Sequence, residues 1–592
     1  MHKRHVILYT IRILWRADRV ALCTLLVIDS FACILPLVCT KLIADIIALF
    51  SQSLLDRNAI FGVAGIYVIL NLLGYVLLPI KEHFHQRFRD RVGAMSETLL
   101  YEKINSLPGI ECFEDSEFYN KLLLAKDGSG MRFISITDMF SAILAGVITI
   151  GLSAYYLVQV QWLIAVIALG ALLPGTVYDF WAAKNRLDLY RSRSESTRQL
   201  KYYGELFTNP AYAKEMRTLR LGEYVLEKYR VLFQTELARI NRIRTRNATV
   251  GVFCTAVGAV LSGASLFMYI HKAVMQTADA GSIVLYISLL PQFVNGVRAV
   301  INGVAQTKNN NYYVQHFIDF LEMEPSGWRK PSCELTRPIR SIQFEHVSFR
   351  YPHARQYALQ DVSFQVNTPS LVAIVGENGS GKSTLVKLLL NLFSAESGRI
   401  LVNGTDINYF FPESYHRKLS AVFQSPARFS FTIGENVRFA DIERDISDRE
   451  VKESCVAADV ADTVEQMPKG YESVLGKQFT DGVEVSDGQW QKISLARALC
   501  ANADMLIFDE ASADLDPRAE HLFYQRIRMH SRDKLTFYIT HRLSGTSDAD
   551  LILVMNQGKL VQIGSHRELM AQEGKYKELY TMQASGYQDG NP

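Results

Sequence analysis

Six long apolar segments in the first half of the chain constrain its fold more than any other feature. They span residues 20–50, 59–80, 133–158, 162–180, 250–270 and 280–304. A helix needs about 20 mostly apolar residues to cross a bilayer, and these segments meet that length. Several of them have no polar face, which argues against six buried helices of a large soluble protein. The first half is therefore predicted to form six transmembrane helices.

The connections between these segments alternate in length. Short ones lie at residues 51–58, 159–161 and 271–279, whereas residues 81–128 and 182–246 form long, charged connections. Lys and Arg gather near the membrane ends of the long connections and at the N-terminus. The positive-inside rule therefore places both termini and both long connections in the cytoplasm. We expect the long connections to form helices that continue well beyond the bilayer.

The composition changes near residues 326–340. The stretch 325–340 carries three prolines. Short β-rich runs then alternate with helical stretches, which is typical of an α/β domain. We expect a transmembrane domain at residues 1–325, a linker at 326–340 and an α/β domain at 341–592. The net charge of +3 gives no indication of nucleic-acid binding, and eight scattered cysteines without a CxxC pattern are predicted to be reduced core residues.

A glycine-rich loop follows the apolar run at residues 371–375 and precedes a helix-like stretch. Its sequence, GENGSGKST, matches the phosphate-loop pattern G-x-x-x-x-G-K-[ST] in the strand–loop–helix context that the pattern requires. Glycines let backbone N–H groups turn toward phosphate oxygens, and the helix N-terminus adds its positive dipole end. Lys382 is predicted to reach the terminal phosphates and Ser383 to ligate Mg²⁺. The predicted nucleotide contacts are Gly376, Glu377, Asn378, Gly379, Ser380, Gly381, Lys382, Ser383 and Thr384.

Five further residues could complete a nucleotide site, and each also has an ordinary structural interpretation. Tyr351 could stack on adenine or be a surface tyrosine. Gln424 follows a short apolar strand and could contact the metal or the attacking water, and so sense the γ-phosphate, or be an ordinary loop glutamine. In MLIFDE, Asp509 could hold Mg²⁺ and Glu510 could be the general base for the hydrolytic water, or the two could be a common strand-end acid pair. His541 could hydrogen-bond the γ-phosphate or be structural.

The stretch VSDGQWQKISLARAL at residues 485–499 makes the pattern specific. It resembles the signature motif of ATP-binding cassette proteins, LSGGQ followed by a basic helix. With the phosphate loop, Gln424, Asp509–Glu510, the segment ASADLDP and His541, the resemblance covers the whole second half. The first half is similar to the six-helix membrane domain of exporters in this superfamily. In the sequence GQWQK, the chain length and the absence of an extra domain, the chain is similar to bacterial exporters of lanthipeptides and other small modified peptides.

The resemblance implies ATP and Mg²⁺ as cofactors and ATP hydrolysis coupled to export across the bacterial cytoplasmic membrane. Two nucleotide-binding domains would face head to tail, so Ser486, Gly488 and Gln489 would contact the partner chain's ATP. With six membrane helices and one such domain, the chain would be a half transporter that works as a dimer. The tips of the long connections, residues 113–122 and 209–216, would be short helices that dock on nucleotide-binding domains, the second on the partner's.

Two positions depart from the family pattern. Asp487 stands where the family usually has glycine, and an acid beside a triphosphate is electrostatically unfavourable. ASADLDP has Ala513 and Asp514 where the family usually has SA, whereas Asp516 fits. Either the chain pairs with a different half transporter in a heterodimer, or Asp487 is tolerated in a homodimer with its side chain turned away from phosphate.

Polar residues also occur within the apolar segments. A stripe in the sixth segment recurs in steps of three and four, on one helical face, and either lines a translocation cavity, packs against other helices or lies outside the bilayer. Its members are Gln292, Asn295, Arg298, Asn302 and Gln306. Asp29 is interpreted as an isolated intramembrane charge. Lys41 and Asp45, four residues apart, are expected to pair.

The expected cargo is a small modified peptide. The alternatives are a lipid, a lipid-linked saccharide or a hydrophobic drug carried by the same machinery. A membrane ATPase with a regulatory or sensing role is an alternative of a different class.

Overall fold

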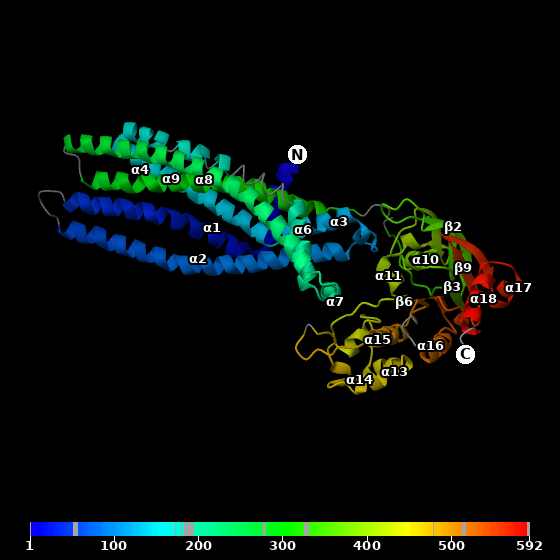
Figure 1. The fold of residues 1–592 in the computed structure, drawn as a ribbon. Coiled ribbons are helices and arrows are strands. Elements are labelled where there is room, and N and C mark those ends of the chain that lie inside the picture. The colour runs from blue at the N-terminus through cyan, green and yellow to red at the C-terminus, as the bar shows by residue number, and fades with distance from the viewer. Residues whose placement is uncertain are drawn as a thin grey trace. The chain divides into compact units, whose positions relative to one another are not determined.

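Figure 1 shows the computed structural model of the chain. It describes residues 2–50, 57–171, 173–178, 180–182, 194–275, 280–324, 331–477, 479–511 and 517–588. The chain divides into two compact units. The first contains Met1–Ser106 and Asn120–Met323, and the second contains Leu107–Tyr119 and Glu324–Pro592.

Long helices that lie side by side build the first unit (Figure 1). They are α1 (His2–Phe50), α2 (Arg57–Asn105), α4 (Met131–Ala171), α8 (Gly222–Met275) and α9 (Ala280–Leu321). Five helical stretches within the described residues are long and apolar enough to cross a membrane: Leu8–Phe50, Arg57–Asn105, Arg132–Gln159, Gly222–His271 and Ala280–Val304. They confirm five of the six predicted segments. Because α2 and α8 continue beyond their apolar parts, the predicted helical extensions are confirmed as well.

The fourth predicted segment is assigned differently. We expected a short connection at residues 159–161, but helical backbone continues through these residues, so residues 162–171 belong to α4. The predicted break was therefore wrong. The three residues are Gln-Val-Gln, which contain neither Gly nor Pro and offer nothing that ends a helix. Residues 172, 179 and 183–193 lie outside the described part of this region.

The tip of the first long connection belongs to the second unit. It contains the short helix η1 (Glu111–Glu114) and the start of α3 (Ser116–Gly128), in place of the single predicted helix. The Ile110 N–H donates to the Leu392 carbonyl oxygen at 2.8 Å, and Asp115 Oδ1 lies 3.2 Å from His353 Nε2. Hydrogen bonds from the Glu117 N–H and then from His353 lower the pKa of Asp115. The predicted docking of this tip on the α/β domain is confirmed.

The tip of the second long connection is a separate short helix, α7 (Pro210–Thr218), which follows α6 (Ser194–Thr208). The Asn209 side chain accepts a hydrogen bond from the Ala211 N–H at 3.0 Å, and proline occupies the first helical turn. Both features favour a helix start at this position. A short helix was predicted here and is confirmed, whereas its docking on a partner chain stays a prediction.

Charged residues of the membrane helices are paired across helices. Asp18 interrupts α1 with non-helical backbone angles, and its carboxylate accepts hydrogen bonds from Arg87 Nε and Arg91 Nη1 at 3.0 and 2.9 Å. We expected Asp29 to be an isolated charge, and this expectation was wrong. Lys81 Nζ of α2 lies 2.6 Å from Asp29 Oδ1. The spacing within one helix could not show this partner on another.

Other predicted polar features have simpler outcomes. Lys41 Nζ and Asp45 Oδ1 pair at 2.5 Å, as predicted. In the polar stripe of α9, Gln292 Nε2 donates to Thr40 Oγ1 of α1 at 2.8 Å, so this member packs between helices. Asn295, Asn302 and Gln306 are exposed in this unit. All eight cysteines are free, as predicted, but only Cys39, Cys455 and Cys500 are buried, so the predicted core position is wrong for the other five.

The second unit contains two sheets. The six-stranded sheet has the order β10-β9-β3-β8-β7-β6 and is parallel except for β10. Its strands are β3 (Ser370–Val375), β6 (Leu419–Val422), β7 (Met505–Asp509), β8 (Leu535–Ile539), β9 (Leu551–Asn556) and β10 (Lys559–Gly564). A four-stranded antiparallel sheet has the order β2-β1-β4-β5: β1 (Ser341–Phe349), β2 (Leu359–Asn367), β4 (Ser397–Val402) and β5 (Thr405–Asp406). The predicted α/β architecture is confirmed.

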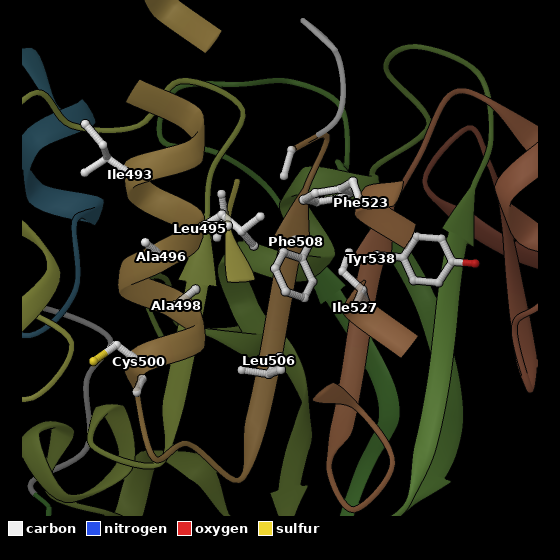
Figure 2. Packing of buried hydrophobic residues seen from close by; sticks show 14 of the residues in the cluster. Ile493, Leu495, Ala496, Ala498, Cys500, Leu506, Phe508, Phe523, Ile527 and Tyr538 are labelled. Atoms are coloured by element: carbon white, nitrogen blue, oxygen red, sulfur yellow. The ribbon is translucent and has the colours of Figure 1, made fainter. Parts of the chain in front are cut away.

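The helices of the second unit alternate with these strands. They are α10 (Lys382–Leu389), α11 (Pro412–His416), α12 (Ile433–Arg438), α13 (Asp448–Ala457), α14 (Ala461–Glu465), α15 (Asp487–Cys500), α16 (Pro517–His530), α17 (His566–Ala571) and α18 (Lys575–Gln588). Side chains of β7 alternate between two apolar clusters because successive residues of a strand point to opposite faces. Met505 and Ile507 join one cluster, and Leu506 and Phe508 join the other. Figure 2 shows part of the second cluster, in which side chains of α15 and α16 pack with Leu506 and Phe508 of β7.

Candidate active site

The predicted site residues follow the carboxyl ends of four neighbouring parallel strands. The phosphate loop follows β3, Gln424 follows β6, Asp509 ends β7, and His541 follows β8. Parallel strands of one sheet end at the same edge, so residues as far apart as Gly376 and His541, 165 positions, meet there. The sheet order, and not proximity in the sequence, assembles the site.

A pocket of about 590 Å³ opens at this edge. It is lined by Ala358 and by ten of the predicted residues: Tyr351, Asn378, Gly379, Gly381, Lys382, Ser383, Thr384, Gln424, Glu510 and His541. Gly376, Glu377 and Ser380 belong to the same loop without lining the pocket, and Asp509 reaches it through Ser383.

Two glycines of the loop occupy positions that a side chain would not fit. Gly376 has φ 152°, and a Cβ there would lie 2.2 Å from the Met555 carbonyl oxygen. Gly381 has φ 102° at the start of α10, and a Cβ there would lie 2.7 Å from the Ala358 carbonyl oxygen. Both backbones are therefore possible only for glycine. The loop bends tightly so that helix α10 begins directly at the pocket.

Lys382 is held at the centre of the loop. Its side chain is buried, and its Nζ donates to the carbonyl oxygens of Gly376 and Glu377 at 2.9 Å each. Burial lowers the pKa of Lys382, and the nearby carboxylates of Glu510 and Asp509 oppose that shift. Its ammonium group is a charged hydrogen-bond donor at the pocket, where it can bind anionic oxygens.

Asp509 is a buried carboxylate next to the loop. Ser383 Oγ donates to its Oδ1 at 3.4 Å. Burial raises the pKa of Asp509, and the negative charge of Glu510 raises it further. A hydroxyl and a carboxylate that lie this close together offer the oxygen ligands that Mg²⁺ prefers.

Glu510 points away from Asp509 into the pocket. Its φ of 49° lies in the left-handed region, which costs a non-glycine residue about 1–3 kcal/mol and persists only where the surroundings hold it. The Glu510 N–H donates to the Ile539 carbonyl oxygen at 3.2 Å, and its Oε1 contacts Nε2 of His541. The strained backbone thus directs one carboxylate toward the pocket and the preceding one toward Ser383.

Tyr351 is anchored beside the loop. Its hydroxyl hydrogen-bonds Thr384 Oγ1 at 3.1 Å, and its ring packs edge-on against Phe349 and Phe393. Lys387 Nζ lies 5.2 Å from the ring centroid. These contacts hold the tyrosine at the pocket, where it could reach an adenine ring. Stacking on adenine stays a prediction.

The signature residues do not line this pocket. Ser486 is the N-cap of α15: its Oγ accepts from the Gln489 N–H at 3.3 Å, and the Gln489 side chain accepts from the Ser486 N–H at 2.7 Å. A Cβ added at Gly488 would meet nothing within 4 Å. The N-terminus of α15 is therefore open around Gly488, and its first backbone N–H groups lie there. Residues 512–516, which include most of ASADLDP, lie outside the described residues.

Sequence reasoning missed Arg428. Its Nη2 lies 2.8 Å from Oδ1 of Asp487, the acidic departure in the signature. Both side chains are exposed, so the pair remains solvated. A single arginine four residues after Gln424 carries no signal that it faces a residue 59 positions later. The pair neutralises the negative charge that made Asp487 appear unfavourable.

Comparisons with known proteins agree with this geometry. A family model described as ABC transporter matches residues 359–513. Subtilin transport ATP-binding protein SpaT of Bacillus subtilis is 26% identical over 96% of this chain and 93% of its own length. ATP-dependent lipid A-core flippases of Methylococcus capsulatus and Xanthomonas oryzae pv. oryzae are 34% and 31% identical. These matches cover 54% and 62% of this chain, and 52% and 62% of the flippases' own lengths. With its pocket and its apolar helices, the chain belongs to the ABC transporter family as a membrane-embedded ATPase of the exporter type.

Proposed function

We propose that this chain is one half of an exporter that uses ATP to move a small modified peptide across the bacterial cytoplasmic membrane, with both termini in the cytoplasm. One observation carries the proposal. The phosphate loop, Gln424, Glu510 and His541 line one pocket in a chain that also contains helices able to cross a membrane.

ATP would bind at this pocket. Tyr351 would stack on the adenine, while the backbone of the phosphate loop and Lys382 would hold the phosphates. Lys382 would exchange its two loop carbonyls for phosphate oxygens, which are stronger acceptors for an ammonium group.

Mg²⁺ fits the oxygen atoms that meet beside the loop. Ser383 and Asp509 are already within hydrogen-bonding distance, and Gln424 lines the same pocket, so these three would hold the ion with the phosphates. When bound, the ion would neutralise phosphate charge. It would also favour the ionised form of Asp509, whose pKa burial raises in its absence.

Glu510 and His541 would act directly in hydrolysis, Glu510 as the proton acceptor and His541 as a hydrogen-bonding group. Glu510 would accept a proton from the attacking water, with its carboxylate aimed by the left-handed backbone. His541 would orient that carboxylate through its Nε2 contact and would hydrogen-bond the γ-phosphate. This pairing favours an active ATPase over a membrane protein that only senses nucleotide.

A second chain would complete the site. Ser486, Gly488 and Gln489 lie outside the pocket of their own chain, so they would contact ATP bound to a partner. The Arg428–Asp487 pair removes the electrostatic objection to a homodimer. A heterodimer with another half transporter remains the alternative.

The tip that contains Ile110 supports a mechanical link between the halves. It packs in the second unit, while α2 and most of α3 on either side belong to the first. Movement of the ATPase domain would therefore be transmitted along the chain to the membrane helices.

The cargo assignment rests on the relative named for subtilin transport, which matches along nearly the whole chain. The flippases, which match a smaller part, favour a lipid instead. Inside-out vesicles that contain the chain would separate these possibilities when offered a labelled modified peptide or a labelled lipid with ATP. We expect peptide uptake that disappears in Lys382→Ala. Lipid movement without peptide uptake would refute the peptide assignment, and ATP hydrolysis without either would favour a sensor.

A further inference from the structure

The first unit contains a charged cavity that the ATPase site does not use. It has a volume of about 480 Å³ and lies among α1, α2 and α4. Its charged lining residues and its histidine are Asp29, Lys81, Glu82, His85, Arg89 and Asp138, and the rest of its wall is made of leucine and alanine with one cysteine, one threonine and one serine. Lys81 directly follows the apolar segment 59–80, so the cavity lies at the proposed cytoplasmic boundary of the membrane.

Asp29 is the most deeply placed charge in this cavity. Its side chain is 7% exposed, whereas that of Lys81 is 39% exposed. Lys81 Nζ lies 2.6 Å from Asp29 Oδ1, but the contact lacks hydrogen-bond angles, and no described atom donates a hydrogen bond to that oxygen. A buried carboxylate gains much from a well-directed donor, so Asp29 retains capacity for a ligand.

The other charges of the cavity form a second group. Asp138 Oδ1 lies 2.7 Å from His85 Nε2, and Arg89 Nη2 lies 3.3 Å from His85 Nδ1. An arginine donor at Nδ1 requires that nitrogen to accept, so in this network Nε2 donates to Asp138. Three carboxylates then face two cations, which leaves one net negative charge beside an apolar wall.

We propose that this cavity binds a primary ammonium group attached to an apolar body. The ammonium would take the place of Lys81 at Asp29, since the half-exposed lysine can withdraw toward water while the buried carboxylate cannot. Glu82 would supply the excess negative charge, and the apolar wall would hold the body of the ligand. A lysine-bearing peptide and an amine-headed lipid share this chemistry. The assignment to cargo rests on the proposed export function.

The test uses the full chain in phosphatidylcholine nanodiscs. The probe is a fluorescent amphipathic octapeptide with a blocked N-terminus and one lysine, and its control carries acetyl-lysine at that position. Fluorescence anisotropy measures both affinities. We expect at least about tenfold tighter binding of the lysine peptide, because the desolvated ion pair is absent from the control. Equal binding of the two peptides, or no binding of either, would overturn the proposal.

Variants locate the site. Asp29→Asn should abolish the preference for lysine, and Glu82→Gln, at an exposed position where folding is not at risk, should reduce it severalfold. Asp45→Asn is the matched control, because Asp45 also lies on α1 and pairs with a lysine but does not line the cavity, and it should keep both the preference and the ATPase rate. A preference that survives both Asp29→Asn and Glu82→Gln would overturn the proposal.

The source of the ammonium group is tested by adding phosphatidylethanolamine to the discs. Weaker lysine-peptide binding there, in the wild type and Asp45→Asn alone, would identify an amine-headed lipid as a competing ligand of the same site. Unchanged binding would identify a peptide ammonium as the ligand. ATP hydrolysis is measured in parallel. ATP hydrolysis without a preference for the lysine peptide would contradict ammonium binding in the cavity alone. A preference for the lysine peptide without ATP hydrolysis would contradict the export function alone.

Discussion

The pair formed by Arg428 and Asp487 predicts a specific pattern of mutational effects on ATP use. Their side chains are 60% and 71% exposed, and their charged atoms lie 2.8 Å apart. An exposed pair of this kind contributes about 0.2–1 kcal/mol to folding, so loss of either residue should leave the protein folded. The larger effect concerns the partner's ATP, because Asp487 lies between the proposed phosphate contacts Ser486 and Gly488.

Arg428→Ala leaves the Asp487 carboxylate without its neutralising charge. Two unit charges about 6 Å apart interact by about 0.7 kcal/mol in water and about 2.8 kcal/mol at an effective dielectric constant of about 20. Because Asp487 is well exposed, the lower half of this interval applies, which corresponds to a KM for ATP about three to twenty times higher. Asp487→Gly combined with Arg428→Ala should restore nearly the original KM, since the repulsive charge is then absent.

The assay is the ATPase rate of purified chain in nanodiscs against ATP concentration, at low and high salt. The effect of Arg428→Ala should shrink at high salt, where the Debye length falls to about 3 Å at 1 M. Arg417→Ala is the control, because Arg417 forms a comparably exposed pair with Glu443 outside the pocket and the signature. An unchanged KM in Arg428→Ala, or a double variant as impaired as the single one, would refute the reasoning.

Three further predictions concern the loop, the membrane helices and the buried carboxylate. Lys382→Ala should weaken ATP binding in calorimetry by about 10- to 150-fold, which is the loss of one charged hydrogen bond of about 1.5–3 kcal/mol, whereas Lys577→Ala should not. Gly146→Ala places a Cβ 2.7 Å from the Gly296 carbonyl oxygen of α9 and should lower thermal stability by about 1–3 kcal/mol; Gly151→Ala, in open space on the same helix, should not. Because the folded-state pKa of Asp509 is raised, its ionised form costs stability as pH rises through that pKa. Asp509→Asn should therefore raise Tm without nucleotide near about pH 7, with a smaller gain near about pH 4; an equal gain at both would contradict the buried charge.

Local patterns predicted most of the residues that line the pocket of the second unit. The phosphate loop needs only a strand, glycines and a helix start within about 15 residues, and all of these are visible in the sequence. The meeting of Gln424, Asp509 and His541 follows from parallel strands that end at one edge. The backbone twist at Glu510, by contrast, has no signal in the residue type, because glutamate rarely adopts positive φ.

Contacts between distant elements could not be predicted. The partners Asp29 and Lys81 lie on different helices, and their meeting depends on how α1 and α2 align, which helical periodicity within one segment does not determine. The same applies to Arg428 and Asp487, which come from a loop and a helix start. The helix assignment through residues 159–161 was missed because segment boundaries were placed by hydropathy alone.

The most direct test of the central claim is the ATPase rate of the chain, purified alone in lipid nanodiscs, compared with Glu510→Gln. We expect measurable hydrolysis in the wild type and its loss in Glu510→Gln, with ATP binding retained in both. That result would support a working homodimer whose signature tolerates Asp487. Substantial hydrolysis in Glu510→Gln would contradict the role of Glu510 as general base, and a folded, ATP-binding wild type without hydrolysis would contradict the homodimer and favour a different partner half.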